Sequence, residues 1–132
     1  MLPALRPLPC PFCPPEAAVV AESTAAVAVR DGFPVAEGHT LVIPRRHVGS
    51  VFELGPDELA DFFALVARVR AQLAADFAPD GFTIGINDGE AAGQTVGHAH
   101  LHIIPRRHGD VPDPRGGVRW VLPEHADYWS AP

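Results

Sequence analysis

The feature that most constrains this chain is the run His-Ala-His-Leu-His at residues 98–102, in which three histidines alternate with apolar residues. In a β-strand the side chains repeat with a period of two. His98, His100 and His102 are therefore expected on one face, with neighbouring imidazoles roughly 6–7 Å apart along the strand. The preceding segment, residues 93–97, is Gly-Gln-Thr-Val-Gly and supplies backbone N–H groups beside the imidazoles. Such a face suits an anion such as phosphate, and a neutral imidazole is also a nucleophile at pH 7.

Size and charge narrow the class of protein. The chain has 132 residues, enough for one domain, and 47% of them are hydrophobic. The net charge of −6 argues against general nucleic-acid binding, which needs a basic surface, so phosphate recognition has to be local. No apolar run approaches ~18 residues, so no transmembrane helix is expected. Residues 1–7 lack the pattern of a secretion signal, and a cytoplasmic location is the default expectation.

Apolar runs bounded by Gly and Pro predict the strands. Residues 24–30 and 38–44 are expected to form a hairpin through a turn at residues 31–34. Residues 48–54 are expected to include a short helical turn, and residues 82–87 to form the strand that precedes the histidine run. The predicted order is therefore two strands, a helix and two further strands.

The long helix is the clearest element in the sequence. Pro56 suits the first helical position, where its missing N–H costs nothing, and Asp57 and Glu58 oppose the positive end of the helix dipole. Apolar residues then recur at steps of three and four as far as Phe77. Pro79, with the glycine two residues later, ends the pattern. The sequence thus predicts an α+β domain in which this helix crosses one face of an antiparallel sheet.

Gly-Gln-Thr-Val-Gly-His-Ala-His-Leu-His-Ile-Ile-Pro-Arg, at residues 93–106, closely resembles the signature of the histidine-triad (HIT) nucleotide hydrolases and transferases. The resemblance extends over about residues 8–108. It implies a HIT-like fold in a single domain, residues 1–132, with a proline-rich arm at residues 1–15 and a C-terminal extension at residues 109–132. It also implies a two-fold homodimer with one continuous sheet.

The resemblance assigns roles to the histidines. His100, in the middle of the run, matches the nucleophile of the family, and its second ring nitrogen is implied to donate to a backbone carbonyl of the same strand. His102 faces the same phosphate and donates to its oxygens. His98 completes the catalytic run, and His39 matches an additional histidine of the family that contacts the triad.

The resemblance also implies contacts with a nucleotide. Gln94 and Thr95 occupy positions that contact phosphate and leaving group, and Asn87 aligns with an amide of the same role. Asp31 aligns with the residue that holds the ribose hydroxyls, although Asp before Gly is also common turn chemistry. His100 and His102 belong to the same nucleotide site. The purine pocket is expected to be apolar, with three contributors implied by resemblance: Phe12, Val27 and Ile43.

A second group of residues predicts a metal site. Cys10 and Cys13 have the two-residue gap of zinc knuckles, and a four-coordinate zinc needs two further ligands. Some branches of the HIT family bind structural zinc with such a pair, a histidine after the second strand and the first histidine of the triad. In this chain those histidines are His47 and His98. The alternative is a pair of reduced cysteines that pack as small hydrophobic residues.

The resemblance implies a hydrolase or nucleotidyl transferase acting on adenosine 5′-phosphate derivatives. Dinucleoside polyphosphates and nucleoside phosphoramidates are the expected substrates, with AMP as product and Mg²⁺ accompanying a polyphosphate. One alternative is a nucleotide-binding sensor or interaction module with little turnover. Another is a catalytic metal centre at the histidines, which the sequence disfavours because no carboxylate obviously completes a ligand set beside the triad.

Overall fold

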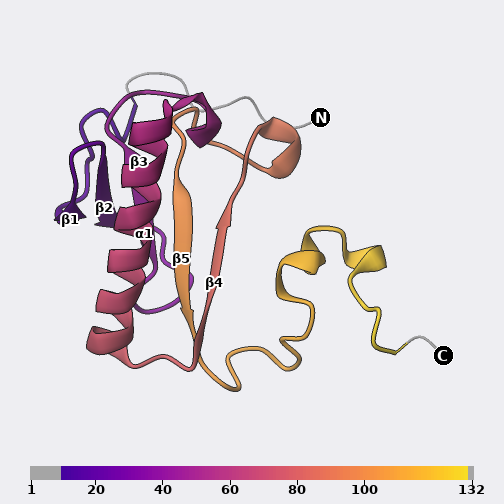
Figure 1. Cartoon of the computed structure of the whole chain (residues 1–132). Helices are drawn as coiled ribbons and strands as arrows, with labels where there is room; N and C mark the ends of the chain where they lie inside the picture. Colours follow the sequence, from indigo (N-terminus) through magenta and orange to yellow (C-terminus); the bar gives the residue numbers. More distant parts are fainter. Residues whose placement is uncertain (1–9, 131–132) are drawn as a thin grey trace.

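The computed structural model describes residues 10–130, and in it one long helix packs on a five-stranded sheet (Figure 1). The strands lie in the order β1-β2-β3-β5-β4, and every neighbouring pair is antiparallel. This confirms the predicted α+β class. Residues 1–9 of the predicted arm lie outside the described residues. The strands are β1 (Val19–Glu22), β2 (Ala26–Arg30), β3 (Thr40–Pro44), β4 (Gly81–Ile86) and β5 (Leu101–Arg106), and the helix is α1 (Pro56–Phe77).

The predicted elements are present with shifted ends, and the structure adds one strand and several short 3-10 turns. The hairpin is β2 and β3, and the short helical turn is the 3-10 helix η1 (Val51–Glu53). Strand β1 was not predicted, because it is short, mostly exposed and irregularly paired with β2, and so carries no alternating pattern. Further 3-10 turns are η2 (Glu90–Ala92), η3 (Gly117–Val121) and η4 (Pro123–His125).

The histidine run is only partly a strand, which corrects the prediction. Strand β5 begins at Leu101, so His98 and His100 precede it. The ladder between β3 and β5 ends where Val42 pairs with Leu101, and β3 finishes two residues later at Pro44, which has no N–H to donate. The amide of Ala99 instead donates to the Val48 carbonyl at 2.8 Å, so the run is held by the loop that follows β3.

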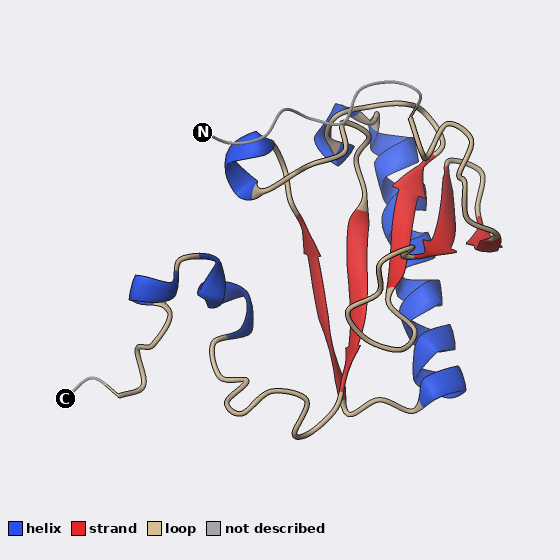
Figure 2. Cartoon of the chain, turned by 180° about the vertical axis from the view of Figure 1, so that it is seen from behind, coloured by secondary structure: helices blue, strands red, loops and turns tan. Residues whose placement is uncertain are grey.

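The sheet has two different faces. The main core lies between the sheet and the buried stripe of α1, where Phe62, Leu65 and Leu73 contact alternate residues of the strands. On the opposite face a smaller apolar cluster is formed by Val27, Val29, Leu41 and Ile43. The helix covers only one side of the sheet (Figure 2), so the second face is available for a site.

Helix α1 begins at the predicted residue and ends in a C-cap formed by the main chain. Pro56 is its first residue, and the Glu58 side chain accepts from the Gly55 N–H at 3.4 Å. The helix ends at Phe77 because Ala78 takes a left-handed conformation, with φ of 45°, while its N–H still bonds within the helix. Within residues 10–130, no helix is long and apolar enough to cross a membrane.

The described part of the C-terminal extension, residues 109–130, turns away from the sheet beside β4 (Figure 1). Its own contacts hold it together: the Arg115 guanidinium lies 4.9 Å from the centre of the Trp129 ring, and the Trp120 indole N–H donates to the Arg115 carbonyl at 2.7 Å. The Arg119 guanidinium lies 4.8 Å from the centre of the Tyr128 ring. The two tryptophans thus pack within the C-terminal region.

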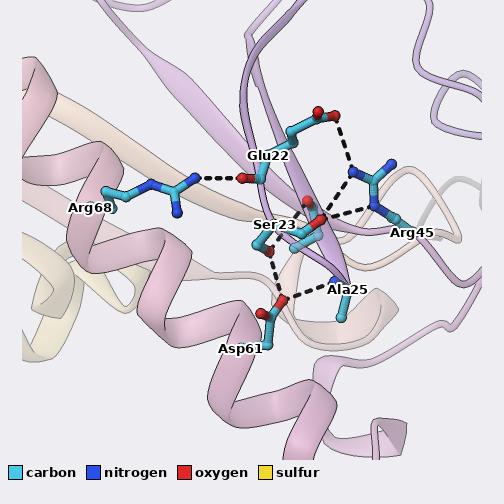
Figure 3. Close-up of polar contacts among 7 residues, drawn as sticks. Glu22, Ser23, Ala25, Arg45, Asp61 and Arg68 are labelled. Carbon is cyan, nitrogen blue, oxygen red and sulfur yellow. Dashed lines mark hydrogen bonds and ion pairs between the residues drawn. The ribbon is translucent and has the colours of Figure 1, made fainter.

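A polar network fixes the turn between β1 and β2 (Figure 3). Asp61 on α1 accepts from the Ser23 hydroxyl at 2.6 Å and from the main-chain N–H of Ala25 at 2.9 Å. Arg45, just after β3, donates to the Ser23 carbonyl at 3.0 and 3.1 Å. Arg68 on α1 donates to the main-chain carbonyl of Glu22. The turn is thereby joined both to the helix and to the end of β3.

We expect Asp61→Ala to lower the free energy of unfolding more at pH 7 than at pH 3. The Ser23 hydroxyl, with help from the Ala25 N–H, holds the pKa of the Asp61 carboxyl below its ordinary value of 3.8. A lowered carboxyl pKa stabilises the fold above the unfolded pKa, and this contribution is lost as the pH falls through the folded pKa. Urea denaturation at both pH values measures the effect. Asp76→Ala, an exposed aspartate of the same helix, is the control, and equal losses for the two variants would contradict the prediction.

Candidate active site and metal cluster

The sheet face opposite α1 opens into a cavity of about 740 Å³. Its floor is a row of side chains that cross the strands: Val29 pairs with Leu41, and Leu41 pairs with His102. The period of two along each strand places these residues on the same face. Phe12 and Ala17, from the N-terminal segment, pack against this floor and close one side of the cavity.

His100 presents an unprotonated nitrogen to the cavity. Its Nδ1 lies 2.9 Å from the main-chain carbonyl of His98, and a carbonyl can only accept, so Nδ1 carries the ring proton. In the neutral imidazole Nε2 then holds a lone pair. The acceptor is the kind of backbone carbonyl that the resemblance implied, and this is the tautomer that a nucleophile requires.

The proton on His102 is placed by a chain of hydrogen bonds that begins at Val35. The Val35 N–H donates to Nδ1 of His39 at 3.1 Å, so the ring proton of neutral His39 is on Nε2. That nitrogen lies 2.9 Å from Nδ1 of His102, which therefore accepts. Neutral His102 is left with its proton on Nε2. His102 is thus a hydrogen-bond donor.

Asp31 stands beside this histidine pair. Its Oδ2 lies 3.4 Å from Nε2 of His39 and 3.9 Å from Nδ1 of His102, while Oδ1 accepts from the Phe33 N–H at 2.8 Å. The expectation that no carboxylate completes a ligand set beside the triad is therefore wrong, because the turn after β2 returns Asp31 to His39 and His102, and the three residues could hold a metal ion. If Nε2 of His39 bound a metal, however, the ring proton would have to move from Nε2 to Nδ1. There it would clash with the Val35 N–H, which donates to Nδ1. The hydrogen bonds of Asp31, His39 and His102 therefore favour a hydrogen-bonded group over a metal site.

Burial keeps these imidazoles neutral. Desolvation lowers the pKa of His39 below its ordinary value of 6.5, and the nearby Asp31 carboxylate opposes this shift. Desolvation is also the main cause of the lowered pKa of His102, with His100 and His39 acting in the same direction. The neutral tautomers derived from the hydrogen bonds are therefore the forms expected at pH 7.

The other predicted nucleotide contacts divide into two groups. Asn87 and Thr95 line the cavity together with the histidines. Gln94 is buried and bonded to the main chain: its Oε1 accepts from the Gly89 N–H at 2.9 Å, and its Nε2 donates to the Gly49 and Val96 carbonyls at 3.0 and 2.9 Å. The structure thus places Gln94 as a brace of the loop that carries Thr95.

The residues predicted for the base pocket are partly displaced. Phe12 lines the cavity. Of the four residues in the apolar cluster on this face, Val29 and Leu41 line the cavity, whereas Val27 and Ile43 do not. All four strand residues alternate with core-facing residues and lie on the same face of the sheet. The prediction therefore identified the correct face but not the positions along the strands that line the cavity. Sequence reasoning also missed Phe33 on the cavity rim, since an aromatic residue in a turn carries no pattern.

The predicted metal ligands come together at the other side of the histidine run. The ligand atoms of Cys10, Cys13, His47 and His98 all lie within 4.8 Å of one another. The Cys13 sulfur is 3.1 Å from Nδ1 of His47 and 3.1 Å from Nδ1 of His98, and the Cys10 sulfur is 3.4 Å from the latter. Two thiols and two imidazoles form a donor set that suits tetrahedral zinc.

The tautomer of His98 fits this role. Its Nε2 lies 2.7 Å from the Pro44 carbonyl and so carries the ring proton, which leaves a lone pair on Nδ1, the nitrogen that faces the thiols. The side chain is fully buried and is not part of the cavity lining. His98 was predicted both as a catalytic residue and as a metal ligand. The structure places its imidazole beside the two thiols. Only its main-chain carbonyl contacts the candidate active site, where it accepts the hydrogen bond from His100.

The sequence and the fold are similar to those of known proteins. The HIT domain family model matches residues 15–109. This chain belongs to the HIT domain family. An uncharacterized HIT-like protein of Mycobacterium tuberculosis is 40% identical over 112 residues, which cover 78% of this chain and 75% of that protein.

An asymmetrical bis(5′-nucleosyl)-tetraphosphatase of Schizosaccharomyces pombe is 47% identical over 77 residues, which cover 58% of this chain and 42% of that enzyme. A zinc-bound histidine-triad protein of Mycobacterium smegmatis superposes with a TM-score of 0.69 at 36% identity, covering 80% of this chain and 85% of that one. The HIT family therefore includes a hydrolase and a metal-bound protein, and this chain has residues that can hold a metal.

We expect the purified protein to carry about one zinc ion per chain and Cys13→Ser to lose it. The variant removes one of the four candidate ligands, so metal content should fall. The melting temperature should drop as well, because a metal bound there would join the N-terminal segment to the sheet. Elemental analysis and thermal denaturation measure both quantities. His125→Gln, outside the cluster, is the control. Metal-free wild-type protein that a chelator leaves equally stable would favour packed, reduced cysteines instead.

The lowered pKa of His39 predicts a loss of stability in mild acid. The unfolded chain takes up a proton at the ordinary pKa of 6.5, whereas the folded chain does so only at lower pH. The free energy of unfolding should therefore fall as the pH drops below about 6.5, until the folded pKa is passed. Urea denaturation between pH 7.5 and 5 measures it. His39→Gln should flatten the curve, and an unchanged slope in that variant would contradict the assignment.

Proposed function

We propose that this protein is a nucleotide hydrolase or nucleotidyl transferase that acts at the α-phosphate of adenosine 5′-phosphate derivatives. The observation that carries the proposal is the pairing of opposite tautomers in one cavity. His100 offers a lone pair on Nε2, and His102 offers a proton on Nε2. A nucleophile beside a donor is the arrangement that displacement at phosphorus needs.

In the first step, Nε2 of His100 forms a bond to the α-phosphorus, and the bond from phosphorus to the leaving group breaks. The leaving group takes the bonding electron pair and receives a proton from solvent. His102 donates its Nε2 proton in a hydrogen bond to the phosphoryl oxygens as their charge increases. His100 keeps its proton on Nδ1, and the His98 carbonyl that accepts this hydrogen bond stabilises the positive charge on the ring.

In the second step, water attacks phosphorus and the N–P bond breaks. AMP is released, one proton of the water passes to solvent, and His100 returns to its neutral tautomer. Splitting the displacement into two steps replaces one slow reaction with two easier ones. The metal cluster is a structural site on this proposal, and Mg²⁺ enters only as the counter-ion of a polyphosphate substrate.

Dinucleoside polyphosphates and nucleoside phosphoramidates are the proposed substrate classes. The similarity to the tetraphosphatase supports the first class. The cavity of about 740 Å³ is lined by apolar residues, an aspartate and the histidines, and this lining supports a nucleotide as the substrate of either class. Asp31 is the proposed partner of the ribose hydroxyls, with Asn87 and Thr95 at the phosphates.

The proposed assembly is a homodimer. Strand β4 is an edge of the sheet, and its Ile84 side chain is 37% exposed. Among residues 10–130, β4 pairs with β5 alone, so the other side of its six residues would offer main-chain donors and acceptors to a second copy. A dimer through this edge would extend the sheet across both chains, as the resemblance implies.

We expect AMP release from a panel containing an adenosine phosphoramidate, a dinucleoside tetraphosphate and ATP, and we expect His100→Ala to reduce it by at least roughly 10³-fold. Chromatographic assay of AMP measures the rate, and the substrate with the highest kcat/KM identifies the leaving group. His108→Ala, a histidine outside the cavity, should retain activity. Tight AMP binding without release from any substrate would contradict the proposal and favour a nucleotide sensor.

A further inference from the structure

Phe33 is the most exposed large hydrophobic side chain among the described residues, with 89% of its surface accessible. Single exposed hydrophobic residues are normal on a protein surface. Phe33 differs because it also lines the cavity that contains Asp31, His100 and His102. Its ring therefore lies where a bound molecule can cover it, although the chain itself leaves it uncovered.

The backbone that carries this ring is anchored. Oδ1 of Asp31 accepts from the Phe33 N–H at 2.8 Å, and Pro34 follows with its restricted φ. Gly32, between the two, has open space around the position that a Cβ would take. The ring is thus presented from a fixed turn, two residues from the proposed ribose ligand, and has few neighbours to restrict its rotation.

The cavity offers an apolar floor on the strands. Val29 and Leu41 form it, and Phe12 and Ala17 border it. A flat ring that rests on this floor buries one face and leaves the other open. The turn that carries Phe33 also carries Asp31, the proposed ligand of the sugar to which such a base would be attached.

We propose that Phe33 stacks on the nucleobase of the bound nucleotide and covers the face that does not rest on the floor. The inference deepens the proposed function and rests on it. Stacking recognises any planar base, so Phe33 adds affinity for the base without selecting among purines. The base in turn removes the Phe33 ring from water.

The experiment measures the Kd of AMP and of ribose 5-phosphate by titration calorimetry. Base stacking is worth about 1–3 kcal/mol, so Phe33→Ala should raise the Kd of AMP by roughly 5- to 150-fold. Ribose 5-phosphate lacks the base, and its Kd should not change. Phe33→Tyr should bind AMP like the wild type. Phe33 contacts little of its own chain, so its removal should leave the melting temperature unchanged.

Phe52→Ala is the matched control, because Phe52 is 66% exposed and lies on η1 outside the cavity lining. An unchanged Kd for AMP in Phe33→Ala, with binding intact, would overturn the inference and leave the proposed function standing. A defect seen only with dinucleotides would also overturn it, since the ring would then serve the second nucleoside. A change in oligomeric state would assign Phe33 to a contact between copies. Wild-type protein that binds neither AMP nor ribose 5-phosphate would instead overturn the proposed function itself.

Discussion

One hydrogen bond connects the two functional regions of this protein: Nε2 of His98 donates to the Pro44 carbonyl at 2.7 Å. Because Pro44 cannot donate to the strand ladder, β3 ends there and its carbonyl becomes available to a side chain. The bond sets the tautomer of His98 and turns Nδ1 toward Cys10 and Cys13. The main-chain carbonyl of the same residue then orients His100. A metal at the cysteines would therefore reinforce the position of the nucleophile through a single residue, without touching a substrate.

The proposed phosphate chemistry would take place in an acidic chain and would use neutral groups. The net charge is −6, and arginines near the strand ends are paired with carboxylates: Arg45 with Glu22, and Arg106 with Asp110. Such surface pairs contribute little stability, but they occupy cations that could otherwise attract a phosphate. The cavity instead relies on imidazoles whose pKa values burial lowers, such as that of His102. An anion is then met by oriented N–H donors, whose direction the hydrogen bonds determine.

The turn between β2 and β3 has several roles at once. Asp31 lies beside the His39–His102 pair, Phe33 borders the cavity, and the Val35 N–H determines the tautomer of His39. A substrate that contacts this turn therefore also contacts the group that orients the proton donor. On the proposed function, recognition of the nucleoside and positioning of the proton-donating histidine would therefore be joined in one short segment.

The amino-acid pattern alone determined the class of the fold, the long helix, the histidine run and the cysteine pair of the candidate metal site. These are local signals, in which periodicity or short spacing indicates which residues share a face or a metal. His47 and His98 joined the candidate ligands only through the resemblance to the family. The tertiary structure decided where β5 begins, that Gln94 braces a loop, and that Asp31 stands beside the triad. Each of these depends on main-chain groups or side chains far away in the sequence, such as the Val48 carbonyl that holds Ala99. No local pattern encodes such a partner, because hydrogen bonds between distant segments form only when the sheet brings the segments together.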